Sequence, residues 1–104
     1  YDDFMKMDLR VGEILTADPV PKSNKLLKFT VDTGLDHRII VSGVAKHFSS
    51  QEMIGKKVTV LLNLAPRNIM GINSQGMLLF AENEDGRLKL VAPDTSATNG
   101  ADIS

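Results

Sequence analysis

Short stretches in which apolar and polar residues alternate recur along this chain, with turn residues after about every 8–12 positions. Alternation with a period of two indicates strands that turn one face to a core. This pattern limits the chain to a small all-β domain. The predicted strands cover residues 9–16, 27–32, 38–42, 57–62, 77–81 and 88–91.

Only two short segments carry helix signals. Ser49 and Glu52 have the spacing of a capping box, and Gly55 can end the turn that follows. Asp2 or Asp3 could cap a single helical turn ending near residue 7. The first of these helices lies between the third and fourth strands, as in the OB fold. We therefore predict a five-stranded OB-fold barrel with one short helix and a short N-terminal helical turn.

Loops are expected where the residues do not suit a strand. Residues 18–24 contain two prolines, which a central strand excludes. Residues 63–77 form a connection that is long for a hairpin. Residues 92–104 are polar and should form a C-terminal extension, either irregular or packed as an arm on another surface. We expect one domain over residues 1–104, and Tyr1 in place of Met suggests a piece of a longer chain.

Composition excludes several classes of protein. Hydrophobic residues make up 42% and charged residues 24%, as in globular domains. No apolar run approaches the roughly 20 residues of a membrane span, and no signal peptide is evident, so no membrane partner is expected. Cysteine is absent and His37 and His47 stand alone, so we expect no metal or other cofactor. The lack of cysteine fits a cytoplasmic protein.

No set of residues suggests catalysis, so the domain by itself should not be an enzyme. No serine lies in a nucleophile-elbow sequence, and no glycine-rich phosphate loop is present. The acidic residues Glu82, Glu84 and Asp85 fall on a tight turn, where water would screen them.

Charge is unevenly distributed although the formal net charge is only −1. Residues 22–67 hold eight basic and three acidic side chains, while the rest of the chain holds four basic and ten acidic ones. Such a chain can present a basic face to an anionic partner, although scattered surface charge would give the same count. Lys25 and Lys28 could neutralise phosphates at a groove, or could simply be solvated at the start of a strand.

Residues 63–77 are the best candidate for a binding loop. Asparagine, arginine and serine side chains there can bond to phosphate, ribose and base edges. The alternative is a structural loop in which Gly71 and Gly76 adopt special backbone angles. Phe29 and Phe80 fall at apolar strand positions and should lie in the core. This argues against base stacking along a flexible strand and favours recognition of a folded RNA by its shape.

Seven motifs in order resemble one known family. They are DLRVG (8–12), KLLK (25–28), VD (31–32), RIIVSGVA (38–45), GKKV (55–58), NLAPR (63–67) and SQGM (74–77). Together they are similar to the tRNA-binding domain at the C-terminus of bacterial methionyl-tRNA synthetases. The same domain occurs in free-standing tRNA-binding proteins and in the endothelial monocyte-activating polypeptide family.

The resemblance implies a domain that binds the outer corner of tRNA by shape, appended to the catalytic body of a synthetase. By motif match, the implied tRNA-binding residues are Lys25, Lys28, Asn63, Arg67, Ser74 and Met77. It also implies a homodimer, for which Phe4 and the tail after Val91 are the candidate surface. Asn68 stands where the family usually has lysine, and Asn73 where an acid is common. The alternative is a free-standing tRNA-binding or chaperone-like dimer on the same fold.

Overall fold

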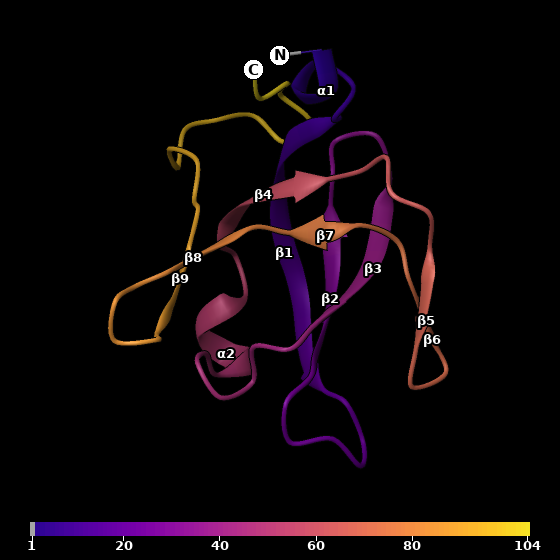
Figure 1. The fold of residues 1–104 in the computed structure, drawn as a ribbon, viewed down its shortest axis with the longest axis vertical. Coiled ribbons are helices and arrows are strands. Elements are labelled where there is room, and N and C mark those ends of the chain that lie inside the picture. Colours follow the sequence, from indigo (N-terminus) through magenta and orange to yellow (C-terminus); the bar gives the residue numbers. More distant parts are fainter. Residues whose placement is uncertain (1) are drawn as a thin grey trace.

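The computed structural model describes residues 2–104, so Tyr1, used above as a sign of a longer chain, lies outside the described residues. A five-stranded antiparallel sheet with strand order β3-β2-β1-β4-β7 curls into a barrel, and two small hairpins project from it (Figure 1). In chain order the elements are α1 (Asp2–Met5), β1 (Leu9–Pro19), β2 (Leu27–Asp32), β3 (His37–Ser42), α2 (Ser50–Met53), β4 (Lys57–Leu61), β5 (Arg67–Ile69), β6 (Ile72–Ser74), β7 (Met77–Leu78), β8 (Phe80–Glu82) and β9 (Leu88–Leu90).

The predicted five-stranded barrel with a helix between its third and fourth strands is confirmed. Burial alternates along β2, where Leu27, Phe29 and Val31 point inward. Facing strands complete the core because their inward residues meet at the barrel centre. Its fully buried members are Ile14, Phe29, Val31, Ile40, Met53, Val58 and Val60.

The helix α2 forms as the capping signal predicted. The Ser49 side chain accepts a hydrogen bond from the amide of Glu52 over 3.3 Å. Gly55 then adopts a φ of +85°, which ends the turn at little cost for a residue without a β-carbon. Met53, on the inner side of this short helix, is fully buried and closes the bottom of the core. Neither helix in residues 2–104 has the length and apolar character needed to cross a membrane.

Edge strand β3 closes the barrel against the segment that leads into β7. The Gln75 amide donates to the carbonyl oxygen of Ile39 over 2.8 Å, and the Ile39 amide donates to the Gln75 side chain over 3.2 Å. The Val41 amide donates to the hydroxyl of Ser74 over 2.9 Å. Side chains thus replace part of the regular strand ladder at this seam.

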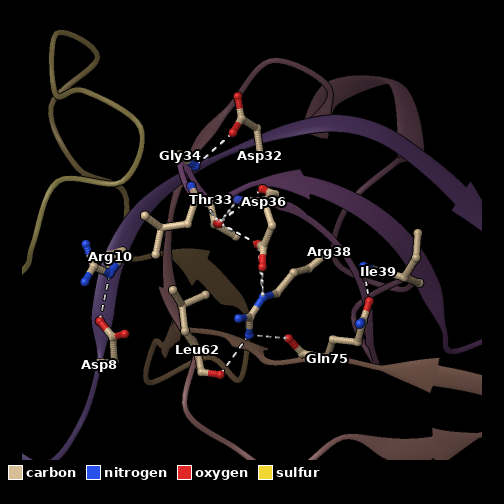
Figure 2. Close-up of polar contacts among 11 residues, drawn as sticks. Asp8, Arg10, Asp32, Thr33, Gly34, Asp36, Arg38, Ile39, Leu62 and Gln75 are labelled. Atoms are coloured by element: carbon tan, nitrogen blue, oxygen red, sulfur yellow. Dashed lines mark hydrogen bonds and ion pairs between the residues drawn. The ribbon is translucent and has the colours of Figure 1, made fainter.

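Arg38 secures the same seam at the end of the barrel (Figure 2). Its Nη1 donates to the carbonyl oxygens of Leu62, at 2.8 Å, and Gln75, at 3.2 Å, while its Nε pairs with Asp36. The Thr33 hydroxyl donates to the Asp36 carboxylate over 2.7 Å. That hydroxyl and then the Arg38 guanidinium hold the pKa of Asp36 below its usual value.

Three predicted boundaries were wrong for physical reasons. Strand β1 continues through residues 18 and 19. Pro19 is tolerated there because β4 pairs with β1 only as far as Glu13, so Pro19 has just one neighbouring strand. The expected loop at 63–77 contains the hairpin β5–β6, turned by Met70 and Gly71, which both have positive φ. The expected strand at 77–81 is divided into β7, which joins the barrel, and β8, which pairs with β9.

The C-terminal extension packs on its own barrel. Beyond Glu13, where β2 ends, the free edge of β1 is covered by residues 100–103. Val11 exchanges backbone hydrogen bonds with Gly100 and Ala101, and the Ile103 amide donates to the carbonyl oxygen of Leu9. This pairing brings the two ends of the chain to the same end of the molecule (Figure 1).

Gly34, in the turn between β2 and β3, allows the extension to approach so closely. An added β-carbon at Gly34 would lie 2.4 Å from the backbone oxygen of Asn99 and 2.5 Å from the Cα atom of Gly100. The Asn99 side chain in turn accepts a hydrogen bond from Lys57 and donates to Glu13 and Asp32. The extension is therefore bonded across β4, β1 and β2.

Candidate functional site

A groove of about 420 Å³ on this barrel is lined mainly by apolar side chains. Its walls come from the end of β3 and the chain after it, the β5–β6 hairpin with the chain on both sides of it, the strands β7 and β8, and single residues before β2 and in β9. Its apolar lining includes Leu26, Val44, Leu64, Ile69, Met77 and Phe80. Arg67 is the only charged residue among the side chains that line it.

Two loops flank the groove, and both belong to positions where OB folds bind nucleic acids. One is the connection between β1 and β2, at residues 20–26, and the other is the connection between β4 and β7, at residues 62–76. The first contributes Leu26 to the groove and carries the exposed Lys25 next to it. The second contributes Arg67, which is also exposed.

Lys28 leaves the sheet on the face that carries the groove. It is half-buried on β2 and lies directly opposite Val41 on β3. Residues directly opposite in an antiparallel pair share one face of the sheet, and Val41 lines the groove. Within residues 2–104, none of Lys25, Lys28 and Arg67 forms an ion pair, so their charges are free to meet an anion.

Ser74 lies at the groove but its hydroxyl already has a structural partner. The side chain is only 4% exposed and accepts the hydrogen bond from the Val41 amide. Met77, three residues further on, is 44% exposed and forms part of the rim. These two residues of the SQGM motif therefore differ: Ser74 bonds to β3 and stabilises the barrel, whereas Met77 is exposed to solvent.

Asn63, like Lys25 and Lys28, is not among the residues that line the groove, and its side chain is bonded to the chain's N-terminal segment. Its side-chain oxygen accepts a hydrogen bond from the amide of Asp8, and its side-chain nitrogen donates to the carbonyl oxygen of Lys6. These bonds tie the segment after α1 to the end of the barrel. The residue order of the motif does not reveal this, because the partners lie more than 50 residues away in the sequence.

The two departures from the family pattern lie opposite each other on the β5–β6 hairpin. Asn68 pairs with Asn73, and the Asn68 side chain accepts a hydrogen bond from the amide of Gly71. Asn68 therefore stabilises the hairpin turn, a role that a lysine side chain, which has no acceptor, could not fill.

Sequence reasoning missed the contribution of Phe80 and Leu26 to the site. Phe29 is fully buried as expected, but Phe80 is only half-buried: it packs against Phe48, with ring centroids 5.7 Å apart, and also lines the groove. The strand pattern marked Phe80 as apolar, and Phe80 does pack against the core, but the pattern could not show that its side chain stays partly exposed. In the part of the chain that the structure describes, no three His, Asp or Glu side chains gather as metal ligands would.

Comparison with known proteins gives a consistent set of similarities. Residues 9–102 match the family described as "Putative tRNA binding domain". The chain is 55% identical over 104 residues to a methionine–tRNA ligase of Flavobacterium johnsoniae, covering all of this chain and 15% of that protein. It thus spans about 15% of the length of such curated relatives.

Solved structures extend the comparison to the fold. A MetRS-related protein from Pyrococcus horikoshii matches with a TM-score of 0.94 and 37% identity, over 99% of this chain and 94% of that one. The chaperone CsaA from Bacillus anthracis matches with a TM-score of 0.88 and 26% identity, over 99% and 95% of the two chains.

Proposed function

The chain belongs to the tRNA-binding domain family, and from this premise we propose that its groove and the two flanking loops form the surface that holds folded tRNA. The observation that carries this placement is the position of Lys25, Lys28 and Arg67. Arg67 lines the groove, Lys25 directly precedes its lining residue Leu26, and Lys28 lies opposite its lining residue Val41. None of the three is neutralised by a carboxylate within residues 2–104.

Electrostatics supports an anionic partner whose affinity depends on salt. The basic residues are concentrated between positions 22 and 67, and the acidic ones lie mainly outside that range. Each cation that contacts a phosphate releases condensed counterions, so binding should weaken as salt rises. Three cations set on a rigid barrel favour a partner of fixed shape over a flexible single strand.

We place the domain as an appendage of a methionine–tRNA ligase. The relatives that cover this chain carry that name and are several times longer. An appended tRNA-binding module raises the concentration of tRNA near a catalytic body in the same polypeptide, without adding a catalytic group of its own. Such a protein would act in the cytoplasm, where tRNA is charged.

We also propose that the end of the barrel with the two termini joins a second copy of this chain. Phe4, Met5 and Met7 are all exposed there, although side chains of this size are usually buried. Asn63 fixes the segment that carries them, and residues 100–103 lie beside it on β1. A self-complementary contact between two such patches would bury these apolar side chains.

The apolar groove gives a second candidate function some support. A chaperone also needs exposed apolar surface, and two structural neighbours are named chaperones. The unpaired cations beside the groove favour RNA over an apolar peptide, because they would remain unmatched against an uncharged chain.

Titration with two RNAs of equal length separates these functions. We expect the domain to bind folded tRNA more tightly than an unstructured RNA, and to lose affinity for tRNA as salt is raised. Fluorescence anisotropy at two salt concentrations measures both effects. Binding to neither RNA, together with binding to an unfolded apolar polypeptide, would overturn the proposal in favour of the chaperone function.

A further inference from the structure

We propose that the groove receives an unpaired nucleobase of the bound RNA, while Arg67 holds a phosphate of the same strand. This inference rests on the proposed function, since it adds a base-binding pocket to a surface otherwise expected to read only the RNA backbone. It also revises the expectation that base contacts are unimportant here.

The composition of the groove points to a base rather than to the RNA backbone. Duplex RNA offers phosphates and 2′-hydroxyls to a protein and keeps the faces of its bases stacked inside. A surface built only for such contacts needs polar side chains. This groove of about 420 Å³ is instead walled by Leu26, Leu64, Met77 and Phe80. The match for such a surface is a flat apolar group, and in RNA that group is an unstacked base.

The position of Arg67 at the groove points to a nucleotide, which carries a phosphate as well as a base. Arg67 is exposed at the groove and has no ion-pair partner in residues 2–104. A nucleotide combines an apolar base with an anionic phosphate, so it fits an apolar floor with a cation at its rim. A guanidinium can hold a phosphate oxygen pair or stack on the base itself. An uncharged peptide would satisfy the floor and leave Arg67 unmatched.

The polar groups at the groove determine how far it can distinguish one base from another. Ser74 is only 4% exposed and its hydroxyl accepts a hydrogen bond from the Val41 amide, so it is poorly placed to read the edge of a base. Apart from Arg67, Ser42 and Ser74, the side chains that line the groove are apolar. Stacking without edge contacts accepts any base, because every base has a π-face. With few polar side chains in its lining, the groove should therefore require an unpaired base and select its identity only weakly.

Fluorescent tRNA tests the proposal directly. 2-Aminopurine is placed at one unpaired position of tRNA at a time, and the domain is titrated into each RNA. We expect one position to change its fluorescence strongly on binding. Met77→Ala should reduce that change and weaken tRNA binding severalfold, because the variant loses the apolar surface that the base would cover.

A methionine outside the groove supplies the matched control. Met70 is 55% exposed at the tip of the β5–β6 hairpin and does not line the groove, so Met70→Ala should keep tRNA affinity within about twofold. A fully base-paired RNA supplies the second control, because Met77→Ala should leave its weaker binding unchanged.

Each other outcome has a separate meaning. If no 2-aminopurine position responds, or if Met77→Ala weakens tRNA and fully paired RNA equally, base insertion is overturned while tRNA binding stands. If wild-type protein fails to bind tRNA, the proposed function itself fails. If an uncharged peptide binds in a Met77-dependent way without displacing tRNA, the groove serves peptides and the inference is overturned.

Discussion

The hydroxyl of Ser74 accepts a hydrogen bond from the backbone amide of Val41 over 2.9 Å, and this bond joins the wall of the groove to the edge strand β3. A binding-motif residue is therefore also part of the barrel seam. The geometry of the groove and the closure of the fold depend on the same contact.

Replacement of Ser74 should cost stability. In Ser74→Ala the buried Val41 amide loses its acceptor, and we expect the free energy of unfolding to fall by about 1–3 kcal/mol. Urea denaturation measures this loss. Asn73→Ala, at an exposed neighbouring position, should change stability little. Unchanged stability in Ser74→Ala would show that the hydroxyl is free to contact RNA instead.

Replacement of Arg67 should weaken RNA binding without affecting the fold. Arg67 is exposed and forms no ion pair within residues 2–104, so Arg67→Ala should reduce tRNA affinity and lower the slope of log affinity against log salt by about one. Anisotropy titrations over a salt series measure both. Lys56→Ala removes the same charge from the turn between α2 and β4, outside the groove lining, and should change neither. Equal effects of the two variants would place the RNA elsewhere.

Replacement of Gly34 should release the C-terminal extension. Both Gly34 and Gly86 have a φ of +82°, but only at Gly34 would a β-carbon collide with the backbone of Asn99 and Gly100. Gly86→Ala should therefore cost only the backbone strain of about 1–2 kcal/mol, and Gly34→Ala should cost more. Hydrogen exchange should also show faster exchange at the amides of Gly100 and Ile103 in Gly34→Ala alone. Slow exchange there in both variants would contradict the packing described.

The Asp36 carboxylate should make stability depend on acid pH. Its folded-state pKa is lowered by the Thr33 hydroxyl and by Arg38, whereas in the unfolded chain it returns to about 3.9. The stabilisation is therefore complete above about pH 4 and is lost as the pH falls through the folded-state pKa. Asp36→Asn should lower the urea midpoint slightly at pH 7, and this difference should close in acid. A difference that stays constant down to pH 2 would contradict the assignment.

Replacement of Phe4 should test the proposed dimer. Phe4 is 44% exposed, so Phe4→Ser should leave the folded domain intact and shift it toward the monomer. Sedimentation equilibrium measures the association. Ile54→Ser removes an apolar side chain of similar exposure at the end of α2, and should leave association unchanged. Equal association of wild type and Phe4→Ser would exclude this surface.

Local chemistry explains why several elements could be predicted from the sequence. The alternation at residues 27–32 gave the bounds of β2, and the spacing of Ser49 and Glu52 located α2. These signals depend on neighbours in the sequence, so they are readable without the fold. The β5–β6 hairpin was missed because its turn uses Met70 at positive φ, where a non-glycine residue is uncommon.

The candidate site could be predicted only in part. The motifs indicated Arg67 and Met77, which the structure brings to one groove, but they gave no sign that Asn63 ties down the N-terminal segment. Phe80 was assigned to the core because its strand position is apolar. Whether such a side chain is covered depends on which strand lies beside it, and here none covers it completely.

The sequence by itself determined the all-β class, the position of the helix, the uneven charge and the family, because each is written in residues that are close together or in a fixed order. The tertiary structure decided which face carries the groove, which of the motif side chains remain free, and where the C-terminal extension lies. Those properties arise because the fold brings residues from distant segments to one groove: Leu26, Val41, Arg67 and Met77. Contacts between such distant positions depend on strand register and closure, and no local pattern records them.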